Sequence, residues 1–253
     1  PAWFNTVYAK APTDDFEPSL PDGSAVLNPS NVGWAEVPGA SEYDVTLWKV
    51  ENGRDVQVAT ATGLKMGHWD ISEFVGYGET TVTYHWQVVA RNGLGTAASP
   101  VYSFRVLGDD QRMGYKLLPG WNLVAVPFPV EESVGGQELF ELAPQVYERL
   151  AGSFVQAVGS VPGGTGMWLF APERQELQVW TAVEMTAAPC LPPELQKGWN
   201  LAGICGTEEL LVDCVAEGIT AIWQWNGTRL EPVVIEDGVA LLEPYVGYWL
   251  QME

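Results

Sequence analysis

The sequence predicts an all-β protein. Between residues 20 and 107, apolar and polar residues alternate in short runs, which is the two-residue period of strands with one buried face. The 253 residues include 27 glycines and 18 prolines, a content typical of many short strands joined by turns. The chain also repeats a Gly-Trp-Asn-Leu segment, at residues 120–123 and 198–201. Together these features predict a β-sandwich followed by a pseudo-symmetric β domain built from two repeats with short helical turns.

Composition and charge argue against several functions. The chain has 12 Lys and Arg against 32 Asp and Glu, a formal charge of −20. This charge repels phosphate backbones and anionic lipids, so we expect no nucleic-acid partner. We expect no membrane insertion either, because no apolar run approaches the roughly 18 residues that a spanning helix needs. The acidic, lysine-poor and turn-rich composition fits a secreted or cell-surface protein.

Residues 20–107 are expected to form the first domain, after an extended N-terminal segment over residues 1–19. In one run Tyr43, Val45 and Leu47 share a face, and in another Tyr84 and Trp86 do the same. The strand candidates are residues 32–37, 43–48, 83–90 and 101–106, and Gly, Pro and Asn occur in the segments between them. About seven strands in about 90 residues are typical of a two-sheet sandwich.

Two segments of this domain carry a resemblance. The first is Trp34 followed by Val37-Pro38-Gly39-Ala40 and Tyr43-Asp44-Val45, and the second is Thr83-Tyr84-His85-Trp86 continuing to Asn92-Gly93-Leu94-Gly95. Together they resemble a fibronectin type III domain over roughly residues 20–107. The resemblance implies a sandwich of seven strands in two sheets. It does not imply an integrin contact, since the sequence contains no Arg-Gly-Asp tripeptide.

A polar stretch bounded by glycines, residues 108–113, is expected to link this domain to the second. After it, three blocks of sequence each recur once and in the same order, at offsets of 76 to 81 residues. The matching blocks are 120–125 with 198–203, 146–148 with 222–224, and 166–170 with 247–251. Such order argues for duplication. The second domain would then span 114–253, as copies over about 114–188 and 189–253 that pack on each other, because one copy alone buries too little surface.

Each copy contains a short helical candidate, at residues 137–142 and 208–216. The first copy also has a strand-like stretch at 176–181, and residues 3–9 are a candidate for its counterpart in the second copy. The repeated blocks resemble the Gly-Trp-Asn-Leu and Gly-Tyr-Trp repeats of large extracellular and cell-surface bacterial proteins, which often accompany fibronectin type III domains. The resemblance covers about 114–253 and implies no catalytic residues, because these repeats are defined by structural aromatic residues.

The residue types that carry chemistry form no recognisable constellation. The two histidines, His68 and His85, lack the spacing of a metal site. The acidic pairs are neighbours in sequence, so their side chains point apart on an extended chain and do not form a glycosidase pair. We therefore expect no enzyme, no metal and no cofactor. The cysteines, Cys190, Cys205 and Cys214, are expected to be buried free thiols, with a Cys205–Cys214 disulfide as the alternative.

Twelve tryptophans are the most distinctive feature of the sequence. We expect core packing for the six at repeated or inward positions, which are Trp34, Trp86, Trp121, Trp168, Trp199 and Trp249. Four other aromatic residues are the candidates for exposure and ligand binding, namely Trp48, Trp69, Tyr77 and Trp225. An exposed indole can stack on a sugar ring or anchor a protein. Incidental or interdomain packing is the alternative for these four residues.

These observations favour a non-catalytic structural or interaction region, of the adhesion type, in a secreted or cell-surface bacterial protein. The alternative is a carbohydrate-binding accessory module of a polysaccharide-degrading system, for which the tryptophans are the motivation. The expected partner is an unidentified protein or glycan, and the chain is expected to be a monomer.

Overall fold

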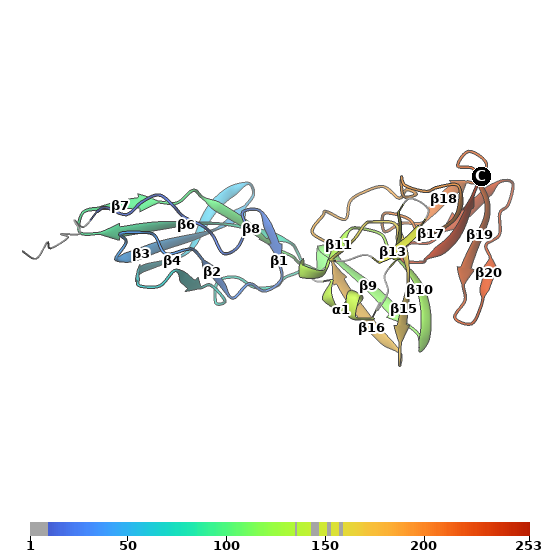
Figure 1. Cartoon of the computed structure of the whole chain (residues 1–253), viewed down its shortest axis with the longest axis horizontal. Coiled ribbons are helices and arrows are strands. Elements are labelled where there is room, and N and C mark those ends of the chain that lie inside the picture. Colours follow the sequence, from blue (N-terminus) through green and yellow to red (C-terminus); the bar gives the residue numbers. More distant parts are fainter. Residues whose placement is uncertain (1–9, 135, 143–146, 151–152, 157–158) are drawn as a thin grey trace, which may run out of the picture. The chain divides into compact units, whose positions relative to one another are not determined.

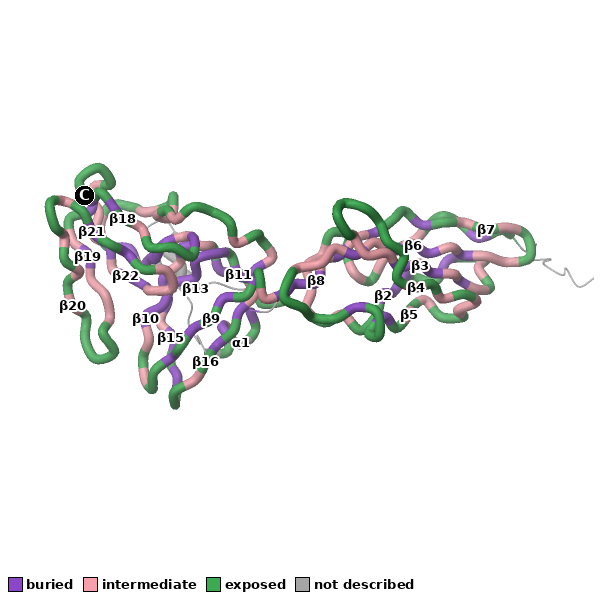
Figure 2. The backbone as a smooth tube through the Cα atoms, turned by 180° about the vertical axis from the view of Figure 1, so that it is seen from behind, coloured by how far each residue is buried: buried purple, intermediate pink, exposed green. Residues whose placement is uncertain are grey.

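The computed structural model describes residues 10–134, 136–142, 147–150, 153–156 and 159–253. It is nearly all β, which confirms the predicted fold class, with one short α-helix among the described residues. Contacts divide the chain into two compact units, Pro1–Asp109 and Asp110–Glu253. Buried residues lie on the strands of both units, as Figure 2 shows. In the described part of the chain, no helix is long and apolar enough to span a membrane.

The first unit is a sandwich of two sheets (Figure 1). The larger sheet has the order β1-β8-β6-β3-β4, with β7 also paired to β6. Its strands are β1 (Ser24–Val26), β3 (Glu42–Glu51), β4 (Arg54–Leu64), β6 (Val82–Asn92), β7 (Gly95–Ala98) and β8 (Tyr102–Val106). Strand β1 runs parallel to β8, and the other pairs are antiparallel. The smaller sheet pairs β2 (Asn31–Gly33) with β5 (His68–Asp70).

Aromatic side chains fill the core between these sheets. Trp86 is completely buried, and its ring lies 6.4 Å from that of Trp34 and 5.1 Å from that of Tyr102. The Trp34 ring in turn meets Tyr43 edge-on at 5.3 Å. The predicted burial of Trp34 and Trp86 is therefore confirmed. Phe16 packs against the same core, so part of the N-terminal segment contributes to the sandwich.

The expected linker, residues 108–113, contains regular structure. Asp109–Gln111 form a 3-10 helix, and β9 (Arg112–Leu117) begins directly after it. Gln111 is buried, and its carbonyl accepts a hydrogen bond from the backbone N–H of Thr181 at 3.0 Å. The division between the two units lies within this stretch.

The second unit is built on a six-stranded antiparallel sheet with the order β10-β15-β17-β22-β19-β20. Its strands are β10 (Gly120–Val126), β15 (Thr165–Ala171), β17 (Gly198–Ala202), β19 (Ile219–Trp225), β20 (Leu230–Pro232) and β22 (Tyr248–Met252). Among the described residues, four smaller strand pairs accompany it. They are β9 with β16 (Gln175–Trp180), β11 (Val130–Glu131) with β14 (Ser160–Val161), β12 (Tyr147–Leu150) with β13 (Ser153–Gln156), and β18 (Leu210–Asp213) with β21 (Val239–Leu242). A 3-10 turn (Glu132–Val134) precedes the helix α1 (Gln137–Leu142).

The two predicted helices have different outcomes. The helix at 137–142 is confirmed as α1. The helix at 208–216 is wrong, because residues 210–213 form strand β18. Val212 is buried while Leu211 is exposed, which is a strand's alternation, and Asp213 Oδ1 accepts from the N–H groups of Val215 and Ala216 to form a turn. The strand-like stretch at 176–181 matches β16. Residues 3–9 and residue 146 lie outside the described residues.

The two halves of the second unit pair reciprocally. Two residue pairs join the halves. Val124 in β10 pairs with Val246, just before β22, and Ala202 at the end of β17 pairs with Thr165 at the start of β15. At corresponding positions of the two halves, Gly166 and Gly247 lie close to the backbone of the other half. A Cβ added to Gly166 would lie 2.8 Å from the Ala202 nitrogen, and one added to Gly247 would lie 2.6 Å from the Val124 oxygen. Both glycines are therefore needed for each half to approach the other half's backbone.

An asparagine closes the turn before β10 and before β17 in the same way. Asn122 Oδ1 accepts from the Leu118 N–H at 2.9 Å, and its Nδ2 donates to the carbonyls of Leu118 and Gly120 at 2.8 and 3.0 Å. Asn200 makes the same three bonds, at 3.0, 2.7 and 3.1 Å, to the residues four and two positions before it. Gly120 and Gly198 both have a φ of 94°, which favours glycine.

The substitution Asn200→Ala is expected to lower the free energy of unfolding of the second unit by about 1 kcal/mol, because it removes three partly buried hydrogen bonds to the backbone of Gln196 and Gly198. Asn200 is buried, whereas Asn122 is only half-buried, so Asn122→Ala is expected to cost less. Urea denaturation of both variants measures the difference. Equal stability of Asn200→Ala and the unmodified chain would contradict this account of the turn.

Candidate functional site

Two of the predicted binding residues lie on different sheets of the first unit. Trp48 is half-buried in β3, on the face opposite the buried Leu47, and is paired with His85 across the sheet. Trp69 is half-buried in β5 of the smaller sheet, where it packs against the core and its ring lies 5.6 Å from Phe74. Since one residue faces away from the core and the other toward it, they do not form a common surface.

The remaining two predicted residues belong to different units. Tyr77 is exposed, and its hydroxyl donates to Asp109 Oδ1 at 2.7 Å. Trp225 is half-buried in β19 of the second unit, and its ring meets that of Trp168 edge-on at 5.2 Å. Of the four predicted residues, Trp225 is the one that the structure places within a larger aromatic cluster.

This cluster occupies one face of the six-stranded sheet, opposite the face that carries the core. Across the strands, Trp121 is paired with Phe170 and Trp249 with Trp223. The pairing places seven aromatic residues on this face, which we call the aromatic face: Trp121, Trp168, Phe170, Trp199, Trp223, Trp225 and Trp249. Six of the chain's twelve tryptophans thus share one face of one sheet.

The prediction that the repeated tryptophans pack in the core is therefore wrong for all four of them in this unit. Trp121 is 51% exposed and Trp199 is 40% exposed, while Trp168 and Trp249 are half-buried. The core takes their neighbours instead, such as Met167 beside Trp168 and Leu250 beside Trp249. Because β15 and most of β22 carry apolar residues on both faces, alternation alone does not identify the inward face.

A signal for the missed residues does exist in the sequence. Each of the two Gly-Trp-Asn segments carries an asparagine directly after its tryptophan. An asparagine that closes a turn with three backbone bonds must point toward that turn, and neighbouring side chains on a strand point to opposite faces. The turn chemistry of Asn122 and Asn200 therefore directs Trp121 and Trp199 to the other face.

The sheet curves toward the aromatic face. Trp168 in β15 touches Trp225 in β19, although β17 and β22 lie between these strands. The Trp225 indole N–H also donates to the Trp121 carbonyl in β10 at 2.9 Å. The ring of Trp121 meets Phe170 edge-on at 5.3 Å. These contacts fix the orientation of several rings before any ligand binds.

A hollow of about 280 Å³ opens on this face, lined by Trp199, Trp223, Leu230 and Trp249. None of these side chains is ionisable, so the hollow presents an uncharged, mainly apolar surface of indole rings and one leucine to a ligand. On the opposite, core side of β22, burial raises the pKa of Tyr248 to about 12, and its hydroxyl accepts from the Glu243 N–H at 2.9 Å. The site is suited to binding an uncharged or apolar surface.

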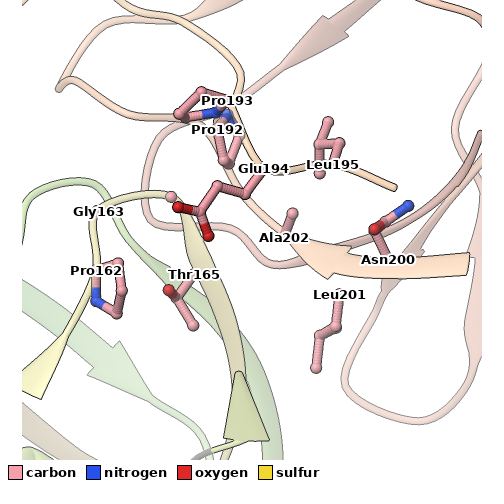
Figure 3. Close-up of a pocket in the computed structure, with 11 residues that line it drawn as sticks. Pro162, Gly163, Thr165, Pro192, Pro193, Glu194, Leu195, Asn200, Leu201 and Ala202 are labelled. Carbon is pink, nitrogen blue, oxygen red and sulfur yellow. The ribbon is translucent and has the colours of Figure 1, made fainter. Parts of the chain in front are cut away.

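A second hollow, of about 200 Å³, lies where residues 162–165 meet residues 192–195 and β17. The Glu194 carboxylate extends toward Gly163 and Thr165 (Figure 3). Glu194 is the one ionisable side chain among the described residues that line it. A glycosidase needs two carboxylates across its cleft, so this hollow does not provide that pair. Among the described residues, no group of three His, Cys, Asp or Glu side chains is arranged to hold a metal ion.

Comparison with known proteins finds no family model, no curated protein and no solved structure that matches this chain. The functional proposal therefore depends on the geometry of the aromatic face.

Proposed function

We propose that this chain is a non-catalytic interaction region, of the adhesion type found in secreted or cell-surface bacterial proteins, and that the aromatic face is its binding surface. The partial exposure of Trp121 and Trp199 carries the proposal. Burying apolar surface stabilises by about 25 cal/mol per Å². A partner that covers these rings would gain this free energy. Clustered exposed aromatic residues are typical of binding surfaces.

The internal symmetry supports a related proposal, that residues 114–188 and 189–253 arose by duplication. The asparagine turns and the glycine contacts recur at corresponding positions of both halves. The fibronectin type III resemblance of residues 20–107 stays an expectation, with which the two-sheet sandwich of the first unit is compatible.

A carbohydrate-binding accessory module is the second candidate function, favoured by the uncharged lining of the hollow. An indole presents a flat, polarisable surface on which the apolar face of a sugar ring can stack. The net charge of −20 would repel acidic polysaccharides. The expected ligand of this candidate is therefore a neutral polysaccharide.

The substitution Trp199→Ala is expected to weaken polysaccharide binding at least tenfold, because anchoring aromatic residues at interfaces contribute about 2 kcal/mol or more. The measurement is a tryptophan-fluorescence titration of the whole chain with a panel of neutral soluble polysaccharides. Trp199 lines the hollow and is already partly exposed, so its removal is expected to disturb the fold little.

The substitution Trp48→Ala provides the control, since it removes an indole from the first unit. It should leave the affinity unchanged. Equal loss of binding in both variants would contradict the assignment to the aromatic face. The absence of a saturable signal across the panel would rule out the carbohydrate candidate, and binding of a protein partner would then be tested with the same two variants.

A further inference from the structure

Cys190 and Cys205 lie directly opposite each other in the second unit. They form an isolated antiparallel bridge, in which each backbone N–H donates to the other's carbonyl, at 3.3 and 2.9 Å. The Cα atoms of such a pair lie about 5.5 Å apart, with both side chains on the same face. Disulfides need a Cα separation of about 4.4–6.8 Å. The backbone geometry of this bridge therefore permits a disulfide.

The two thiols also influence each other. Burial, together with the neighbouring Cys190 thiol, raises the pKa of the Cys205 thiol to about 11. Cys190 is exposed, and it lines a hollow of about 480 Å³ that gives access to its sulfur. The expectation that all three thiols are buried is therefore wrong for Cys190, which is exposed, and for Cys205, which is only half-buried; it is confirmed for Cys214.

Cys214 has different surroundings. It is buried in the core beneath β17 and β22, and its thiol donates to the Val212 carbonyl at 3.7 Å. The nearest sulfur partner of Cys205 is thus Cys190, and the alternative of a Cys205–Cys214 bridge receives no support from the geometry.

We propose that Cys190 and Cys205 form an intramolecular disulfide in an oxidising environment, with a small external disulfide such as oxidised glutathione as the oxidant. The accessible Cys190 thiolate attacks the external disulfide, forming a mixed disulfide and releasing one glutathione thiolate. The Cys205 sulfur then attacks the Cys190 sulfur, forming the bridge and releasing the second. The two protein thiols are oxidised, the external disulfide is reduced, and the two thiol protons pass to the released thiolates.

This bond would close a loop that contains β17. The closed segment runs from residue 190 to residue 205 and includes Trp199 of the aromatic face. A cross-link over such a loop restricts the unfolded chain, so oxidation is expected to raise the melting temperature of the second unit by about 5–10 °C. The proposal is independent of the ligand of the aromatic face.

The test is to equilibrate the whole chain with oxidised glutathione and then count free thiols after denaturation. The expected count falls from three to one, with a mass loss of about 2 Da for the two hydrogens removed and a Cys190–Cys205 cross-link in non-reducing peptide maps. The variant Cys214→Ser should form the same cross-link and retain no free thiol. The variant Cys190→Ser, altered at an exposed position, should form no intramolecular bridge.

Three results would overturn the proposal. They are three free thiols after oxidation, a cross-link between Cys205 and Cys214, or a bridge between two chains that is seen as a covalent dimer on a non-reducing gel. Reduction by dithiothreitol should reverse the rise in melting temperature in the unmodified chain and in Cys214→Ser, but should not change the melting of Cys190→Ser.

Discussion

In a chain that ends at residue 189, residues 110–189 are expected not to fold, and therefore to show no cooperative unfolding transition. The first half of the second unit does not complete its own sheet, since β15 pairs with β17 and Val124 pairs with Val246. Both partners are removed by the truncation. Strands with an exposed apolar face and unpaired edges are unstable in water.

Calorimetry separates the two units in this experiment. The truncated chain should keep the transition of the sandwich, residues 1–109, and should show no second transition. A chain ending at residue 109 is the matched control and should melt at the same temperature as that remaining transition. A separate cooperative transition from residues 110–189 would show that the first half folds alone, and would contradict the reciprocal pairing as the source of its stability.

The substitution Trp86→Ala is expected to destabilise the first unit by about 3–5 kcal/mol. The indole is completely buried, contacts Trp34 and Tyr102, and lies on the central strand β6 between β3 and β8. Its removal leaves a cavity that both sheets border, and the rigid strands around it can close only part of that space. Urea denaturation gives the change in the free energy of unfolding.

The matched control is Trp48→Ala on the neighbouring strand. Trp48 lies on the outer face of the same sheet and is half-buried. Its removal is expected to lower the free energy of unfolding by about 1 kcal/mol, because only the buried part of the ring stabilises the fold. Similar losses in the two variants would mean that the inward face of β6 is not the main source of stability in this unit.

The faces of the first unit could be predicted from the sequence because its strands have one polar face. In β3, the buried Val45 and Leu47 alternate with residues that reach solvent. The period of two then identifies the inward side directly. The burial of Trp86 and the outward position of Trp48 follow from that period.

In the second unit, alternation does not identify the inward face. In β15, the half-buried Trp168 stands between the buried Met167 and Leu169, and every position from Met167 to Ala171 is apolar. The predicted helix at 208–216 is wrong for a related reason. Residues 210–213 pair with β21, and pairing with a distant strand outweighs a weak local preference for helix. Likewise, the partner of Cys205 follows from strand pairing rather than from spacing along the chain.

The sequence alone therefore determined that this protein is nearly all β, which side of the first sandwich is buried, and that the Gly-Trp-Asn-Leu segment of the second unit occurs twice. The tertiary structure was needed to show that six tryptophans line one face of the second sheet and that Cys190 faces Cys205. The physical reason is that alternation distinguishes inside from outside only where one face is polar. For a strand that is apolar on both faces, the side that becomes core depends on which distant strands cover it.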